Sequence, residues 1–152
     1  MTVTVSTPWA LMGCPACGVV AVGHGRRVRV LHDVPGAVPV RLRWRQRTWR
    51  CPDAGCPVGV FVEQHLTLVA PRASLTSRAV TWAIEQLHRE HATIQGLSRQ
   101  LGVAWKTLWR AVRPRLAELA ADPARLDGVA TLGVDEHVWH HTPHKAAIKG
   151  PT

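Results

Sequence analysis

The fold of this chain is decided by one alternating stretch, Val38-Pro39-Val40-Arg41-Leu42-Arg43-Trp44-Arg45-Gln46-Arg47. Successive side chains of a β-strand point to opposite faces of a sheet, so apolar and basic residues separate here onto two faces. The apolar face carries Val40, Leu42 and Trp44. A weaker strand is expected at residues 26–31, and residues 33–36 supply the turn between the two. We therefore expect a β-meander with one apolar and one cationic face.

Two pairs of cysteines flank this meander, Cys14-Pro15-Ala16-Cys17 and Cys51-Pro52-Asp53-Ala54-Gly55-Cys56. Each pair forms a tight turn that can grip one side of a tetrahedral metal ion, and the strands between the pairs bring the two turns together. The spacing predicts a structural Zn²⁺ site in a β-rich zinc-ribbon domain over residues 12–70. Its ligands are predicted to be Cys14, Cys17, Cys51 and Cys56.

Other interpretations of the cysteines are a redox dithiol and four unconnected buried thiols. The N-terminus has no secretory signal, and the cytosol keeps thiols reduced, so a disulfide framework is not expected. His24 and His32 are alternative metal ligands, but four thiolates complete a tetrahedral shell, so we expect both histidines on the surface.

The apolar residues change to a helical period in a second segment, residues 74–120. A first helix is N-capped by Ser74 or Thr76 and carries a broad apolar stripe formed by Leu75, Ala79, Trp82, Ala83, Ile84 and Leu87. Two further helices, at about 94–101 and 105–119, resemble a helix-turn-helix. Gly96 is expected where the helices cross, and Gly102 in the turn, where a positive φ is needed. The small core is predicted to contain Ile94, Leu97, Leu101, Val103 and Leu108.

The start of the last helix is the predicted DNA-reading surface, because a recognition helix contacts bases through its first turns. It carries Trp105, Lys106, Thr107, Trp109 and Arg110. At least one of the two tryptophans is expected in the core, and in a plain helical hairpin both would be. Ala104 is a poor N-cap, so Thr93 should cap its helix better.

The charge distribution indicates a polyanionic partner. The net charge is +9, and eight arginines but only one acid lie between Arg26 and Arg50. Arginines that share one face repel each other unless an anion compensates them, so we predict contacts with DNA phosphates. These contacts are assigned to Arg41, Arg43, Arg45 and Arg47. A solvated face is the alternative. The sequence contains no membrane-spanning run, and a cytoplasmic location is expected.

The order of these features resembles the N-terminal half of bacterial insertion-sequence DDE transposases of the ISL-three family. The resemblance rests on seven stretches: residues 14–18, 32–35, 47–52, 55–57, 61–63, 93–110 and 132–136. It implies recognition of terminal inverted repeats in double-stranded DNA. It also implies that Asp135 is the first of three catalytic carboxylates of an RNase H-like domain, which together hold two divalent cations such as Mg²⁺ in the full-length enzyme.

The chain departs from that family after residue 127, because Asp135 and Glu136 are its only later acids. The second Asp and the Glu of the triad are absent. We therefore expect residues 129–152 to be a truncated stub of the RNase H-like domain with a tail, and the chain not to be an enzyme on its own. Asp135 could also be an ordinary surface acid on an edge strand.

The expected fold is α+β, with a zinc ribbon, a helix-turn-helix domain and the stub in that order. The alternative function is a stand-alone zinc-ribbon and helix-turn-helix transcriptional regulator. The sequence leaves the oligomeric state open, and a homodimer is one of its alternatives.

Overall fold

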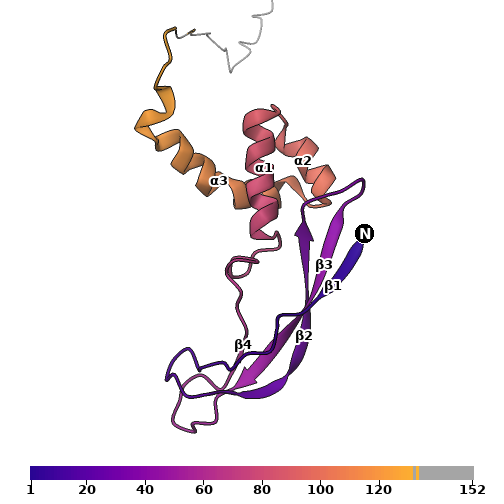
Figure 1. Ribbon diagram of the computed structural model, residues 1–152, viewed down its shortest axis with the longest axis vertical. Coiled ribbons are helices and arrows are strands. Elements are labelled where there is room, and N and C mark those ends of the chain that lie inside the picture. Colours follow the sequence, from indigo (N-terminus) through magenta and orange to yellow (C-terminus); the bar gives the residue numbers. More distant parts are fainter. Residues whose placement is uncertain (132, 134–152) are drawn as a thin grey trace, which may run out of the picture.

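The computed structural model describes residues 1–131 and residue 133, and it shows a mixed α+β fold (Figure 1). Its elements are β1 (Thr2–Val5), β2 (Val22–Asp33), β3 (Val40–Arg50), β4 (Val60–Val62), α1 (Ser77–Arg89), α2 (Ile94–Leu101), α3 (Trp105–Ala121) and the short 3-10 helix η1 (Pro123–Leu126). The expected α+β class is confirmed. Most of the predicted RNase H-like stub, including Asp135, lies outside the described residues.

A long antiparallel hairpin of β2 and β3 forms the centre of the sheet. Its register runs from Val22 opposite Arg50 to Asp33 opposite Val40, with one irregularity between Gly23 and Gly25. β2 is therefore longer at both ends than the predicted strand at residues 26–31. The alternation predicted for β3 is present, because its residues are buried and exposed in turn from Val40 to Gln46.

The second edge of β3 is shared by two short strands. β1 pairs with the first half of β3 in parallel, from Thr2 opposite Arg41 onward. β4 pairs with its last residues in antiparallel fashion. β1 precedes the predicted sheet domain, which begins at residue 12. Its four residues are too few for a recognisable period, and their pairing partner lies far along the chain.

Two apolar cores lie on either side of the hairpin tip. The sheet core is formed by Leu31, Val40, Leu42, Trp44 and Val69. Val69 belongs to the segment from Gln64 to Thr76, which we call the linker and which covers the apolar face of the sheet. The helical core is formed by Leu75, Ala79, Ala83, Leu97, Leu101, Leu108 and Val112. It contains three of the five residues predicted for the helix-turn-helix core, and Ile94 and Val103 pack against it.

The hairpin tip packs directly against the helices (Figure 1). Gly102 approaches Pro39 so closely that a Cβ at Gly102 would lie 3.3 Å from the Pro39 Cβ. His32 Nδ1 lies 3.0 Å from the Leu101 carbonyl oxygen, and the backbone of His32 pairs with Leu75. His32 is thus partly buried in this junction, and the expectation of a surface position was wrong for it.

A buried carboxylate fastens the same junction. Asp33, at the end of β2, is 0% exposed and accepts hydrogen bonds from the Thr76 hydroxyl (2.7 Å) and from Arg78 Nε (2.7 Å). The Thr76 hydroxyl also accepts from the Ala79 amide and so caps α1. The N-cap of α1 is therefore Thr76, one of the two predicted residues.

None of the helices in the described part of the chain is both long and apolar enough to span a membrane.

Candidate metal centre and nucleic-acid interface

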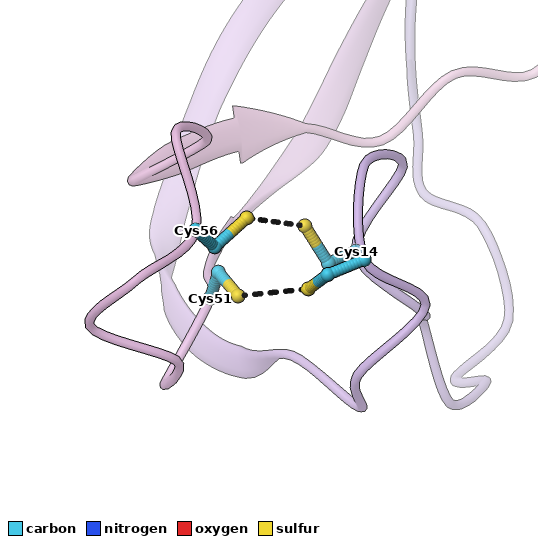
Figure 2. Close-up of side chains that lie close together, drawn as sticks. Cys14, Cys51 and Cys56 are labelled. Atoms are coloured by element: carbon cyan, nitrogen blue, oxygen red, sulfur yellow. Dashed lines mark hydrogen bonds between the residues drawn. The ribbon is translucent and has the colours of Figure 1, made fainter.

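The four cysteines come together at the end of the hairpin that lies away from the helices (Figures 1 and 2). Their sulfur atoms all lie within 4.8 Å of one another, and the Cys14–Cys56 and Cys17–Cys51 pairs are 3.6 Å apart. A tetrahedral Zn²⁺ with Zn–S bonds of about 2.3 Å holds its sulfurs about 3.8 Å apart. All four thiols are free. The cluster is therefore compatible with a structural zinc site, and the four thiols are not unconnected.

Backbone hydrogen bonds shape both cysteine loops. In the first loop, the Cys14 amide donates to the Val19 carbonyl (2.8 Å) and the Gly18 amide to the Cys14 carbonyl (2.9 Å). Gly18 has a φ of +74°, which a residue with a side chain rarely adopts. In the second loop, the Gly55 amide donates to Asp53 Oδ1 at 2.9 Å. Each pair of sulfurs is thus held by its own turn.

The same turns set the protonation of the thiols. Backbone amides of Cys17 and then Ala16 lower the pKa of Cys14 to about 7. Burial raises the pKa of Cys51 to about 12. The Val58 amide lowers the pKa of Cys56, but burial and the sulfurs of neighbouring cysteines raise it further, so the net shift is upward. Because a metal binds thiolates, it must displace the protons held by Cys51 and Cys56.

The helix-turn-helix geometry follows from its caps. The Thr93 hydroxyl accepts a hydrogen bond from the Gly96 amide at 3.1 Å, and Gly102 ends α2 with a φ of +67°. Ala104 provides no side-chain cap for α3, so both capping predictions are confirmed. Gly96 does not lie at a helix crossing as predicted. A Cβ there would meet only Thr93 Oγ1, at 3.2 Å.

The start of α3 exposes both tryptophans. Trp105 is 49% and Trp109 38% exposed, and Lys106 and Arg110 beside them are also exposed. The prediction that at least one tryptophan is in the core was wrong. Leu108 and Val112 occupy the core positions of α3, and residues 105 and 109 lie about 100° away around the helix. Of the predicted reading residues, only Thr107 is half-buried.

Residues 64–116 match the sequence model of the family described as the helix-turn-helix domain of transposase family ISL3. The match begins at the start of the linker and covers α1, α2 and most of α3. It confirms the resemblance to this family for the helical segment. No curated protein and no solved structure matches the chain. A helix-turn-helix domain of transposases binds DNA, so the exposed start of α3 is the candidate DNA-reading surface of an ISL3-type domain.

Three of the four predicted arginines form a free cationic face. Arg41, Arg43 and Arg45 are exposed on one side of β3, opposite His32, Val30 and Val28 of β2. Within the described part of the chain, no carboxylate forms an ion pair with any of these three arginines.

Arg47 differs from these three although it continues the same alternation. Its side chain is only 13% exposed and lies 3.9 Å from Glu63. It donates to the carbonyl oxygens of Pro8 (2.7 Å) and Thr7 (3.1 Å). Arg47 therefore fastens the segment after β1 to the sheet. No local sequence signal separates it from Arg45, because the segment that covers it lies far away in the chain.

Proposed function

We propose that this chain is the DNA-binding N-terminal portion of an insertion-sequence transposase and that α2 and α3 recognise terminal inverted repeats in duplex DNA. The observation that carries the proposal is the match of residues 64–116 to the ISL3 helix-turn-helix domain. The exposed, basic start of α3 supports it, since a recognition helix enters the major groove with these residues facing the bases. The match to a transposase domain favours this function over a stand-alone regulator.

The chemistry of the α3 surface suggests how it reads a sequence. Lys106 and Arg110 can donate to guanine or to phosphate oxygens. Trp105 and Trp109 offer apolar surface, which in the major groove suits the methyl group of thymine. Four apolar or cationic side chains and no acid in the first turn of α3 fit a polyanionic partner.

The cysteine cluster serves, in this proposal, as a structural Zn²⁺ site. Four thiolates complete a tetrahedral shell and leave no position open for a substrate, which is the arrangement of structural zinc. The ion would tie the loop before β2 to the loop between β3 and β4. It would thereby stabilise a sheet whose own core contains only five buried apolar side chains.

The cationic face of Arg41, Arg43 and Arg45 is proposed to contact DNA phosphates. Such contacts position a protein on the duplex without reading its sequence, and they weaken as salt rises. Inverted repeats present two copies of one site, which a homodimer of this chain could occupy. We place the protein in the bacterial cytoplasm.

We further propose that the 152-residue polypeptide does not cleave or join DNA on its own. Asp135 is the residue that the family resemblance assigns to the catalytic site, and Glu136 is the only acid after it. Two-metal catalysis needs a cluster of carboxylates. Strand cleavage by the purified chain with Mg²⁺ would contradict this part of the proposal.

The DNA-binding proposal is tested by selecting duplexes from a random library with the zinc-loaded protein and measuring their affinity by gel shift. We expect one enriched sequence motif, and we expect Arg110→Ala to weaken binding to it. Arg125→Ala, in η1, is the matched control and should bind normally. Failure to enrich any motif would contradict recognition by α3.

A further inference from the structure

A cavity of about 700 Å³ lies on the linker side of the sheet, away from both proposed DNA surfaces. Its walls come from the first cysteine loop, β2, β4 and the linker, and they include Met12, Arg27, Arg29, Phe61 and Arg72. Arg27 and Arg29 pair with Gln46 and Trp44, whereas Val28 pairs with Arg45, so the cavity and the cationic face are on opposite sides of the sheet. A volume of this size is typical of a small-ligand site.

The cavity has an excess of positive charge. Arg27, Arg29 and Arg72 contribute three guanidinium groups. Glu63 is the only carboxylate in the walls, and its charge is already used. Its Oε1 accepts from the Arg47 amide at 2.8 Å, and its Oε2 accepts from the Thr7 hydroxyl at 2.9 Å and pairs with the Arg47 side chain. Within the cavity, the three arginines therefore lack a compensating anion.

Two of these arginines are held in place at the wall. Arg27 Nε donates to Gln46 Oε1 at 2.9 Å, which leaves its four terminal N–H groups available. Arg29 is hydrogen-bonded to the carbonyl oxygens of Ala70 and Ala73 in the linker. Burial and then the charge of Arg27 lower the pKa of Arg29, which is the effect expected of an uncompensated cationic pair.

Arg72 reaches the cavity from an unusual backbone conformation. Its φ is +61°, in the left-handed region that residues with a side chain rarely adopt. Glycine would adopt this conformation without a steric penalty. An arginine here keeps a third guanidinium at the rim of the cavity.

The remaining wall is apolar and aromatic, with Phe61 and Met12 beside the arginines. Proteins hold unpaired nucleotides by combining a cationic groove for the phosphate with an aromatic ring for the base. In a duplex the bases are stacked inside, so only an unpaired nucleotide can present its base and phosphate together to a cavity.

We propose that this cavity binds one unpaired nucleotide of a DNA strand. The phosphate lies among Arg27, Arg29 and Arg72, and the base lies against Phe61. The inference rests on the proposed DNA-binding function and adds a second kind of contact to it. The α3 surface reads duplex DNA, and the cavity holds a displaced or single-stranded nucleotide next to that duplex.

The test compares two ligands, a short oligodeoxythymidylate and the duplex selected with the wild-type protein, by fluorescence anisotropy. Arg72→Gly removes a guanidinium and suits the backbone, and Arg27→Gln and Phe61→Leu remove one guanidinium and the ring. Each should weaken oligodeoxythymidylate binding by about tenfold and leave duplex binding within about twofold. The two arginine variants should also lower the salt slope for the oligonucleotide by about 0.7 each.

Arg41→Gln on the opposite face is the matched control, and it should weaken duplex binding but not oligodeoxythymidylate binding. Zinc content and thermal unfolding establish that each variant is folded. Wild-type affinity of folded Arg72→Gly and Phe61→Leu for the oligonucleotide would overturn the proposal. So would displacement of the oligonucleotide by equal concentrations of thymidine monophosphate, which would identify a free nucleotide as the ligand, or of polyglutamate, which would indicate an acidic protein segment. If the wild-type protein bound no duplex at all, the proposed function would fail instead.

Discussion

The carboxylate of Asp33 joins the sheet to the helix-turn-helix domain, and replacing it by asparagine should loosen both. Asp33 is fully buried and accepts from Thr76 and Arg78. The asparagine side chain would keep one acceptor oxygen, which can still take the Thr76 hydroxyl. Its amide group would face the Arg78 guanidinium, where two donors meet. We therefore expect Asp33→Asn to lose the bonds to Arg78 and to weaken the N-cap of α1.

The size of the effect depends on the unequal exposure of the pair. Losing one partner of a fully buried ion pair costs about 3–5 kcal/mol. Arg78, however, is 68% exposed, so water can solvate its guanidinium once the carboxylate is gone. A hydrogen bond to a charged group contributes about 1.5–3 kcal/mol. We expect a loss of about 2 kcal/mol in the free energy of unfolding, or a fall in Tm of about 8 °C at about 4 °C per kcal/mol.

The pH dependence provides a second measurement. Burial by itself would raise the pKa of Asp33, but the hydrogen bonds from Arg78 and Thr76 outweigh it, and the net shift is downward. The stabilisation is therefore complete above the pKa of an unfolded aspartate, about 3.9, and is lost as the pH falls through the lower folded pKa. Between about pH 6 and pH 8, the difference between wild type and Asp33→Asn should be constant.

Urea unfolding of the zinc-loaded proteins, followed by far-ultraviolet circular dichroism, measures this difference. Glu85→Gln makes the same carboxylate-to-amide change at an exposed position of α1 and should alter stability by less than about 0.5 kcal/mol. The reasoning is refuted if Asp33→Asn is as stable as Glu85→Gln, or if the stability difference changes between pH 6 and pH 8.

Three further predictions concern the metal centre and the DNA surfaces. Zinc uptake at pH 7 should release at least two protons, from Cys51 and Cys56, and calorimetry in buffers of different ionisation enthalpy measures this number; Cys51→Ser should abolish stoichiometric zinc binding, and zinc retained at full stoichiometry would argue against the site. Trp105→Ala and Trp109→Ala should weaken duplex binding with almost no change in Tm, because both rings are exposed; a large fall in Tm would mean that they pack in a core. Alanine at all three arginines of the cationic face should lower the salt slope of duplex binding by about 2.7, and an unchanged slope would place in solvent Arg41, Arg43 and Arg45.

The parts of the fold that could be predicted are those whose signal is local. The period of two in β3, the close cysteine pairs and the caps at Thr93 and Gly102 each depend on neighbouring residues, and the structure contains all of them. The four sulfurs meet because the β2–β3 hairpin brings together the loops at its open end.

The parts that could not be predicted depend on distant segments. Arg47 and Arg45 occupy equivalent positions in the alternation, yet only Arg47 is covered, by residues 7 and 8. Trp109 has the spacing of a core residue, but Leu108 and Val112 already fill the space against the other helices. The partners of Asp33, Thr76 and Arg78, lie more than forty residues away, and no period or motif connects them to it.

The parallel pairing of β1 with β3 has a consequence for the order in which the chain can fold. β1 cannot find its place until residues 41–44 are available, and the first cysteine pair cannot close a shell until Cys56 is available. The three helices meet through contacts that are much closer in sequence, and such contacts form faster because less chain entropy is lost. We therefore expect the part of the chain made first on the ribosome to complete its structure late, after it has waited for residues 40–62, while the helices assemble soon after they emerge.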